Sequence, residues 1–449
     1  MKRVLIISYY WPPTGGSGVQ RWVKFAKYLP EEGWQPVIYT PENPEMITVD
    51  HSLEEEIPAN AEILKTRIFE PYELYRTLTG TSTRKSAETV TAGNGAQKEV
   101  NPINSQNKGF GKRVSMWIRG NFFIPDPRCM WIRPSVKYLK KYLEEHPVDI
   151  IVSTGPPHSM HLIARKLHLA TKIPWIADFR DPWTKMFYFK HLRLTQFSQW
   201  RHRRLEKKVL DDASVVVAVS PLVRQEFQEM TTTPVELITN GYDECDFAPA
   251  TCGNKAGYLS FTVTHTGLFA NDGNPEILWQ VLADKCTADA AFDSALHIRL
   301  AGKTDSEIIA SISAAGLAGK LCDLGYCTHK NAVTEQQNAD LLILPLRKEP
   351  EYKATLPGKL FEYIAARKPV LGIGQTDGAM AQILASTSSG VVFNWDDAVS
   401  IRRYIDLCWS NRLAGIPTTN PQNIEQFSRR GLTRRMAQLM DSLMDSRTP

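Results

Sequence analysis

The sequence predicts an α/β fold built from two doubly wound domains that face each other across a cleft. Short apolar runs alternate with helical segments, a pattern typical of parallel sheets covered by helices on both faces. The alternation occurs in two separate series, one on each side of a segment rich in Gly, Asp and Asn at 240–257. Two such series in a chain of 449 residues indicate two domains of the same architecture.

The N-terminal series spans residues 1–245 and opens on a strand, a glycine-containing loop and a helix. The helix is expected over Val19–Leu29, because Trp22, Phe25 and Leu29 recur at helical spacing. The strands of this domain are expected at Val4–Ser8, Pro36–Thr40, Val148–Ser153, Pro174–Asp178, Ser214–Val219 and Val235–Thr239.

The C-terminal series spans residues 258–420. Its strands are expected at Phe261–Thr266, Leu296–Ala301, Leu321–Gly325, Leu341–Leu344 and Pro369–Ile373. A final helix over 424–445 is expected to pack back toward the N-terminal domain. Ligands of such sheets bind outside the carboxyl ends of the strands, so the cleft between the domains is the predicted site.

Composition excludes several classes of protein. With 43% hydrophobic and 22% charged residues the chain is ordinary globular material, and a net charge of +5 does not by itself indicate nucleic acid. The seven cysteines form no CxxC pair or zinc spacing, so no metal site or disulfide framework is predicted. No apolar run approaches the length of a membrane span. The expected compartment is therefore the cytoplasm.

One region departs from the alternating pattern. Residues 79–108 are polar and almost free of apolar side chains, which predicts a disordered insertion. Residues 108–141 then carry nine Lys or Arg against the single acid Asp126, interleaved with aromatic residues. This mixture suits an anionic membrane surface at the inner face of the cell membrane, and the alternative is a solvated linker and helix face with some core aromatic residues. The cations and aromatic residues singled out are Lys112, Arg113, Arg119, Arg128, Arg133, Trp117, Phe122 and Phe123.

The segment 355–369 is the strongest functional signal. A buried strand is followed by a loop in which Thr355 and Pro357 signal a helix start, and Gly358 leaves the backbone open. Free N–H groups at a helix start bind phosphate, and Lys359 adds a cation there. Glu362, one turn further on, is placed to accept hydrogen bonds from sugar hydroxyls. The alternative is an ordinary strand–loop–helix unit.

Three further clusters follow predicted strands. Gly15 and Gly16 let a ligand approach the backbone, or form a plain tight turn; they do not make a dinucleotide fingerprint. His158 follows the strand at Val148 and either contacts substrate or is structural. Asp178, Arg180 and Asp181 follow another strand and serve either a ligand or an internal ion-pair network. Those sequence clusters are Pro13–Gly16, Ser153–His158 and Asp178–Trp183.

Several motifs together resemble the family 4 retaining glycosyltransferases, which have two Rossmann-like domains (GT-B), and in particular the bacterial surface-polysaccharide branch. The resemblance extends over most of the chain outside 79–108. The motifs are Y-W-P-P-T-G-G-S-G, I-P-D-P-R-C-M-W, S-T-G-P-P-H-S, W-I-A-D-F-R-D-P-W, I-T-N-G-Y-D and P-G-K-L-F-E-Y-I-A-A-R-K-P-V. The resemblance implies a nucleotide-sugar donor held mainly by the C-terminal domain. It also implies a glycan or lipid-linked acceptor held mainly by the N-terminal domain.

By position, Glu362 corresponds to the second glutamate of the family's E-x7-E motif, which binds the donor ribose. The first glutamate corresponds to Ala354, and Glu349 or Glu351 are candidates to replace it. The Arg and Lys that usually hold the diphosphate are replaced by the loop at Gly267, so Lys359 or Arg347 is expected to supply charge. Asp181 or His158 is expected to orient the acceptor hydroxyl, with Asp178 and Arg180 on the acceptor side. No metal or other cofactor is required.

Two alternatives stay open at this point. One is a catalytically silent binding or scaffold protein that kept the fold, supported by the missing cations and the missing first glutamate. The other is a sugar-nucleotide epimerase of the same architecture. An epimerase needs no acceptor surface, so the basic and aromatic segment and the Asp178–Asp181 cluster disfavour it.

Overall fold

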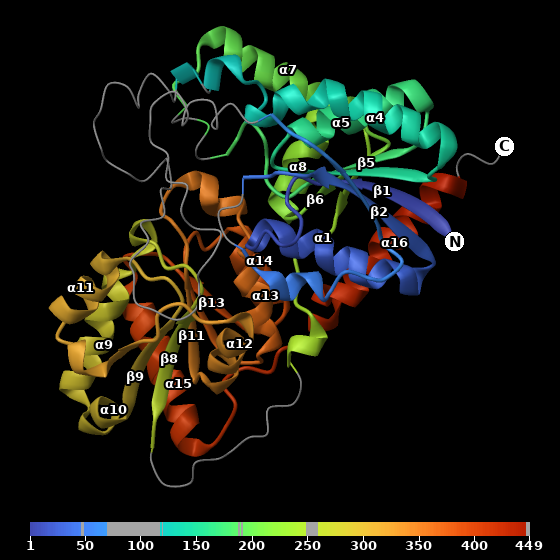
Figure 1. Ribbon diagram of the computed structural model, residues 1–449. Helices are drawn as coiled ribbons and strands as arrows, with labels where there is room; N and C mark the ends of the chain where they lie inside the picture. The colour runs from blue at the N-terminus through green and yellow to red at the C-terminus, as the bar shows by residue number, and fades with distance from the viewer. Residues whose placement is uncertain are drawn as a thin grey trace.

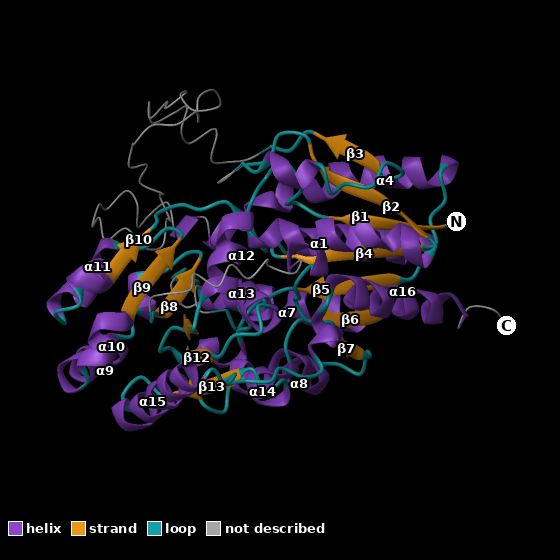
Figure 2. Cartoon of the chain, turned by 90° about the horizontal axis from the view of Figure 1, so that it is seen from below, coloured by secondary structure: helices purple, strands orange, loops and turns teal. Residues whose placement is uncertain are grey.

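The computed structural model describes residues 1–45, 49–69, 117–118, 120–186, 189, 192–247 and 259–445. The predicted insertion at 79–108 and the cations Lys112, Arg113 and Arg119 lie outside these residues. Figure 1 shows two α/β domains stacked one above the other, and Figure 2 shows their two sheets side by side. The predicted fold class, two doubly wound domains facing each other across a cleft, is confirmed.

The N-terminal sheet has seven parallel strands in the order β3-β2-β1-β4-β5-β6-β7. The chain therefore reverses its direction of winding between β1 and β4, which is where ligands of such sheets bind. The strands are β1 Lys2–Ile7, β2 Trp34–Pro41, β3 Glu62–Thr66, β4 Ile150–Gly155, β5 Trp175–Phe179, β6 Val215–Ala218 and β7 Val235–Leu237. The helices are α1 Ser17–Tyr28, α4 Ile132–Glu145, α5 Ser159–Thr171, α7 Gln196–Asp212 and α8 Pro221–Met230.

The C-terminal sheet has six parallel strands in the order β10-β9-β8-β11-β12-β13, with the reversal between β8 and β11. The strands are β8 Phe261–Thr266, β9 Leu296–Ala301, β10 Leu321–Asp323, β11 Leu341–Pro345, β12 Val370–Ile373 and β13 Gly390–Phe393. The helices are α9 Glu276–Ala288, α10 Ala290–Ala295, α11 Ser306–Ala314, α12 His329–Asn338, α13 Gly358–Ala365, α14 Ala379–Ser386, α15 Ala398–Ala414 and α16 Arg429–Asp445.

Two strands lack a sequence signal, and both lie at a sheet edge. In β3, exposed and half-buried residues alternate, and β13 begins with Gly390 and the exposed Val391. An edge strand needs no continuous apolar run, because one side of it faces solvent. The central strands are apolar on both faces and were therefore predicted.

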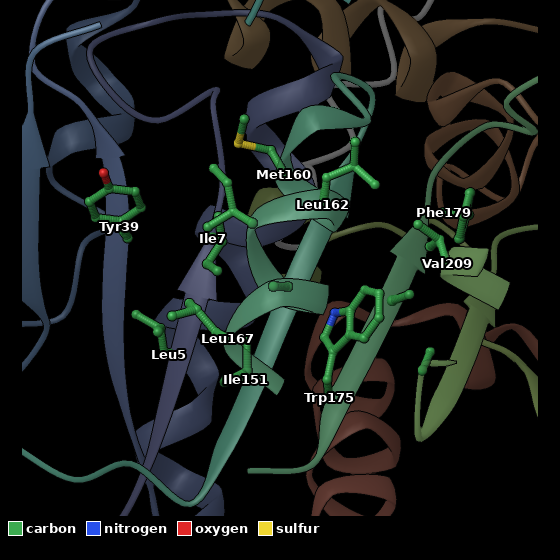
Figure 3. Close-up of a cluster of buried hydrophobic side chains, with 14 of the residues drawn as sticks. Leu5, Ile7, Tyr39, Ile151, Met160, Leu162, Leu167, Trp175, Phe179 and Val209 are labelled. Atoms are coloured by element: carbon green, nitrogen blue, oxygen red, sulfur yellow. The ribbon is translucent and has the colours of Figure 1, made fainter. Parts of the chain in front are cut away.

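Apolar side chains from both faces of the N-terminal sheet form its core. Figure 3 shows Leu5, Ile7, Ile151 and Trp175 on neighbouring strands, with Met160 and Leu167 of α5 packed over them. The opposite face is covered by α1 and, from the far end of the chain, by α16. Leu432, Met436 and Met440 of α16 share a core with Val4, Ile6 and Trp22. None of the helices in the described ranges is long and apolar enough to cross a bilayer.

The chain passes between the domains twice, and the two passages are paired. The backbone N–H of Tyr242 donates to the carbonyl of Phe427 at 3.1 Å, and Arg429 N–H donates to the Tyr242 carbonyl at 2.8 Å. A Cβ atom on Gly241 would lie 2.1 Å from the Phe427 oxygen, so no other residue fits there without moving the backbone. This close approach explains the glycine in the I-T-N-G-Y-D motif.

We expect Gly241→Ala to destabilise the protein by about 1–3 kcal/mol, the usual cost of forcing an extra carbon into a packed site. Gly319→Ala is the matched control, because a Cβ there meets no atom within 4 Å. Urea unfolding of both variants measures the difference. Equal stability of the two variants would show that the paired passages separate easily.

Candidate functional site

The N-terminal half of the site is organised by a buried ion pair between Arg21 of α1 and Asp178 at the end of β5. Both side chains are fully buried, and the guanidinium lies 2.8 Å from the carboxylate. Asp178 also accepts hydrogen bonds from Trp22 Nε1 at 2.7 Å and from Thr154 Oγ1 at 2.8 Å. Burial alone would raise the pKa of Asp178, but the charge and hydrogen bonds of Arg21 outweigh it and hold the pKa below its ordinary value.

Asp178 was expected to serve an acceptor, and the structure places it elsewhere. Its carboxylate has no exposed surface and is already satisfied by Arg21, Trp22 and Thr154. The reason is its position within β5 itself, where side chains point into the domain rather than out of the sheet edge. Asp178 therefore belongs to the alternative anticipated for this cluster, an internal ion-pair network.

Arg180, the next polar residue, joins the loops that leave β1 and β4. Its guanidinium donates to the carbonyl of Gly18 at the start of α1 and to the carbonyl of Pro156 after β4. It also lies over the ring of Tyr10, 5.8 Å from the centroid. Arg180 thus holds together the loops that follow β1 and β4 at the carboxyl edge of the sheet. The sequence did not reveal this structural role.

Asp181 is the carboxylate of this cluster that remains available. It is half-buried, and the described residues offer its side chain no hydrogen-bond partner. Burial raises its pKa to about 6, opposed by the positive charge of Arg180. A carboxylate with such a pKa accepts a proton more readily than an exposed one, which suits acid–base chemistry.

His158 lies behind this edge rather than on it. The imidazole is only 3% exposed and stacks on Trp183 with the ring centroids 4.5 Å apart. Burial lowers its pKa well below the ordinary value, with further lowering by neighbouring positive groups, so the ring is neutral. The described residues leave both ring nitrogens without a hydrogen-bond partner. In this geometry His158 packs against the loop at Trp183, and its contact with substrate stays a prediction.

The first glycine loop precedes α1. Gly16 occupies the position before the helix with φ of 104°, a backbone conformation that L side chains rarely adopt. Gly15 beside it is half-buried. No side chain caps α1, so its first N–H groups are open toward the carboxyl edge of β1.

The C-terminal half of the site is formed by α13 and the loop after β8. The helix begins at Gly358 and is preceded by Pro357, with no side-chain cap. Thr355 was expected to signal the helix start; it instead follows the 3-10 helix η7 Pro350–Ala354, and its N–H donates to Tyr352. The extended backbone that Pro357 occupies separates the two helices. A Cβ on Gly358 would meet nothing within 4 Å, so the space beside it is open.

Lys359 lies against the Gly267 loop. This is the position that Lys359 needs if it replaces the missing Arg and Lys, as predicted. Its ammonium donates to the Leu268 carbonyl at 3.1 Å and lies 3.2 Å from His265 Nε2. Because an ammonium only donates, Nε2 of the neutral His265 is the accepting nitrogen. Burial lowers the pKa of Lys359 to about 8, opposed by Glu362. A Cβ on Gly267 would lie 3.3 Å from the Lys359 nitrogen.

Glu362 is half-buried and is oriented by a residue that the sequence did not single out. Gln336 Nε2 donates to Glu362 Oε2 at 2.9 Å and to Thr266 Oγ1 at 3.0 Å. Glu362 also acts on Arg429, the first residue of α16. Burial and the charge of Arg21 lower the pKa of Arg429 to about 10, and Glu362 opposes that shift. The carboxylate thus faces the junction between the domains.

The other replacements considered for the family's charged residues are placed less favourably. Arg347 forms an ion pair with Asp272 at 2.7 Å. Ala354, at the position of the first glutamate, packs against the N-terminal core. Glu349 begins η7 with its Oε2 buried and without a hydrogen-bond partner among the described residues. Glu351 lines the pocket described next.

A pocket of about 550 Å³ lies between the two halves. Its walls come from the loop after Asp181, from α8 and from η7. The lining residues are Pro182, Thr184, Lys185, Met186, Leu222, Gln225, Glu226, Glu229, Pro350, Glu351, Lys353 and Ala354. The pocket therefore joins the segment that follows Asp181 to the segment that leads into α13.

Two of the basic and aromatic residues of 108–141 are internal: Arg128, which was singled out for the membrane surface, and Trp131, which was not. Arg128 is 8% exposed, lies over the Tyr9 ring and forms an ion pair with Glu45 at 3.2 Å. Trp131 is buried and stacks on Tyr39. Both follow Asp126, whose side chain caps the short helix Pro127–Trp131 and turns these side chains inward. Arg133 and Phe122 are exposed.

The missed residues Arg21, Lys24 and Asp243 lie where α1 meets the first passage between domains. Lys24 is 2.7 Å from Asp243, and Arg21 donates to the carbonyls of Ile238 and Thr239. The signal available in the sequence was three cations, Arg21, Lys24 and Lys27, spaced three residues apart on a helix whose other positions are largely apolar. It is a weak signal, because such cations are usually solvated.

Comparisons with known proteins agree with this architecture. Residues 104–244 match the family model described as Glycosyltransferase Family 4. No curated protein matches the sequence significantly. Among solved structures, sucrose-phosphate synthase from Thermosynechococcus elongatus is similar with a TM-score of 0.61 and 14% identity, covering 99% of this chain and 100% of that one.

Two further structures are similar to the same extent. A glycosyltransferase from Rickettsia africae has a TM-score of 0.60 at 14% identity, covering 99% of this chain and 98% of that one. Anabaena HepE, solved in complex with UDP-glucose, has a TM-score of 0.58 at 14% identity, covering 98% and 100%. At such identities the likeness concerns the fold, which is that of two facing Rossmann-like domains (GT-B).

We expect Asp178→Asn to destabilise the protein by about 3–5 kcal/mol, because it leaves the buried Arg21 without a counter-charge. Asp284→Asn, on the exposed surface of α9, is the control and should change stability by less than about 0.5 kcal/mol. Urea unfolding at neutral pH compares them. A small effect of Asp178→Asn would mean that Arg21 finds another partner.

Asp181→Asn should gain stability relative to wild type as the pH rises, whereas Asp178→Asn should lose stability. Between pH of about 4 and 6 the unfolded chain loses the Asp181 proton while the folded protein, with its raised pKa, keeps it. Wild-type stability is therefore lost through this window, and the asparagine variant, which cannot ionise, avoids that loss. The stability of the variant relative to wild type should rise from pH 4 to 6 and then level off. A pH-independent difference in urea unfolding would contradict the buried carboxyl.

Proposed function

We propose that this protein is a retaining glycosyltransferase, which transfers a sugar from a nucleoside-diphosphate donor to a polysaccharide or lipid-linked glycan precursor. The observation that carries the proposal is the convergence of Lys359, Glu362 and the Gly267 loop at the carboxyl edge of the C-terminal sheet. The match of 104–244 to the family 4 model supports the same conclusion, as do the sequence motifs.

The donor diphosphate is assigned to the start of α13. The N–H groups of Gly358 and Lys359 lie in the uncapped first turn, where the helix dipole favours an anion. The Lys359 ammonium supplies a full positive charge on the same side, and the open space beside Gly358 admits the phosphate. Stabilisation of the departing diphosphate by amides and a cation is the main catalytic requirement of such a reaction.

The donor ribose is assigned to Glu362. A carboxylate accepts hydrogen bonds from two adjacent hydroxyls, and Gln336 holds one of its oxygens in place. Glu362 lies one helical turn beyond the proposed phosphate site, which matches the order of ribose and phosphate in a nucleotide.

The acceptor is assigned to the pocket between the domains. Its wall begins directly after Asp181, whose carboxyl has a pKa of about 6 and no hydrogen-bond partner among the described residues. Asp181 orients the acceptor hydroxyl. The acceptor oxygen bonds to the anomeric carbon on the face from which the diphosphate leaves, the bond to the diphosphate breaks, and the hydroxyl proton passes to the leaving phosphate. Configuration is then retained without a side-chain nucleophile.

A catalytically silent binding protein is the second candidate. It is favoured by one observation, the presence of Ala354 at the position of the first glutamate, packed against the N-terminal core. Donor hydrolysis by the purified protein separates the candidates, because a silent protein binds the donor without consuming it. An epimerase would convert the donor to its epimer without any acceptor, and it would release no nucleoside diphosphate.

We expect Glu362→Ala to lose about 2–3 kcal/mol of donor binding, roughly 30- to 150-fold in Kd, because a charged hydrogen bond to the ribose is removed. Glu307→Ala, at the exposed start of α11, is the control. Calorimetry with a panel of nucleotide sugars measures both variants. Unchanged donor affinity in Glu362→Ala would remove the ribose assignment.

Donor affinity should also fall as the pH rises from 7 to 9. With a pKa of about 8 in the free protein, the Lys359 ammonium loses its proton in this range and the diphosphate loses its counter-charge. Lys359→Met should bind donor weakly at both pH values, with a flatter pH profile. Lys330→Met, an exposed lysine of α12, should keep the wild-type profile. An equally steep profile in Lys359→Met would assign the titration to another group.

A further inference from the structure

The outward face of α7 carries exposed aromatic rings beside cations. Phe197 is 66% exposed and Trp200 is 51% exposed, and their rings stack with centroids 5.8 Å apart. The guanidinium of Arg204 lies over the Trp200 ring at 5.2 Å. At about 100° per residue, Phe197, Trp200 and Arg204 fall on one side of the helix, together with Arg201 and Lys208. Solvent-exposed aromatic pairs of this size are uncommon on a free protein surface.

The charge of this face is positive and unbalanced. Arg201, Arg204 and Lys208 are exposed and form no ion pair with any described residue. The acids of α7 are otherwise engaged, since Lys207 lies 2.5 Å from Asp211 and Arg165 lies 2.5 Å from Asp212. Glu206, the remaining acid of the helix, is buried on the opposite side.

A second aromatic cluster is fastened to the start of the same helix. Trp117 and Phe122 are 40% and 67% exposed, with ring centroids 5.9 Å apart. Asn121 between them accepts a hydrogen bond from the N–H of Thr195, the residue that caps α7, at 2.7 Å. Apolar rings therefore gather at one end of α7 and cations follow along it. Figure 1 shows α7 on the side of the N-terminal domain away from the C-terminal domain.

We propose that the α7 face, defined as Phe197, Trp200, Arg201, Arg204 and Lys208, docks on an anionic lipid surface. Amphipathic rings enter the headgroup boundary while neighbouring cations bind anionic lipids, and a single helix face provides both. The unpaired cations match the charge of that surface. The nearby exposed Ile118 gains nothing from a nucleic-acid phosphate, whereas an apolar side chain is stabilised at a lipid headgroup boundary.

The inward face of α7 connects this surface to the site. Glu206 accepts hydrogen bonds from the N–H groups of Trp183 at 3.1 Å and Thr184 at 3.2 Å, and Trp183 Nε1 donates to His202 at 3.0 Å. The helix that contacts lipid therefore holds the loop that follows Asp181 and lines the pocket. This arrangement suits an acceptor that is presented from a membrane.

Co-sedimentation with vesicles tests the proposal. Wild-type protein should bind phosphatidylcholine vesicles that contain phosphatidylglycerol, and high salt should weaken the binding by screening. A triple variant, Arg201→Gln with Arg204→Gln and Lys208→Gln, should bind about a hundredfold more weakly, since each cation contributes roughly fivefold. Phe197→Ser with Trp200→Ser should also reduce binding. Thermal unfolding verifies that the variants are folded.

The matched control is Arg403→Gln with Leu413→Ser, on the exposed surface of α15, and it should bind as wild type does. Equal binding to vesicles with and without phosphatidylglycerol, no binding to either, or α7 variants that bind as wild type would overturn the proposal. The proposal would also be overturned if the protein did not bind vesicles but formed an oligonucleotide complex or a dimer, and if the α7 variants abolished that complex or dimer. The assay needs no turnover, so its failure leaves the proposed reaction unaffected.

Discussion

The ion pair between Arg21 and Asp178 is the constraint on which the rest of the structure depends. Arg21 belongs to the first helix, Asp178 to the fifth strand, and the same guanidinium binds the carbonyls of Ile238 and Thr239 where the chain leaves the N-terminal domain. One buried cation thus fixes the glycine loop, the strand β5 that leads to Asp181, and the first passage between the domains. A charge buried this deeply is tolerated only because every donor is matched by an oxygen.

Most of the fold follows from local sequence patterns, because a buried parallel strand must be apolar on both faces. All the central strands were therefore predicted, whereas two of the four edge strands, β3 and β13, were not. The order of the strands follows from the rule that doubly wound sheets reverse direction once. What local pattern cannot supply is the partner of each polar group, and that is why the pairing of the two passages at Gly241 was not predicted.

The same distinction separates the two halves of the site. On α13 the functional residues lie within one turn of each other, so spacing alone placed Lys359, Glu362 and Gly358 together. In the N-terminal half the roles of neighbouring residues diverge: Asp178 points into the domain, Arg180 binds two loops, Asp181 stays available and His158 is stacked behind Trp183. Only the direction of each side chain distinguishes a structural residue from one that is available to a ligand. That direction is set by contacts with residues far away in sequence, as Gln336 orients Glu362.

The position of α16 has a consequence for the synthesis of the chain. Domains usually fold in the order in which they leave the ribosome. Here the apolar surface formed by Val4 and Ile6 of β1 and by Trp22 of α1 is covered by Leu432, Met436 and Met440 of α16, which are made after all the strands of the C-terminal domain. The N-terminal domain therefore keeps an apolar surface open until α16 has been made, whereas the C-terminal domain already has all of its strands by then and can fold first. A nascent chain of this protein therefore needs a chaperone most while its C-terminal domain is being made, and its N-terminal core is completed only when α16 docks.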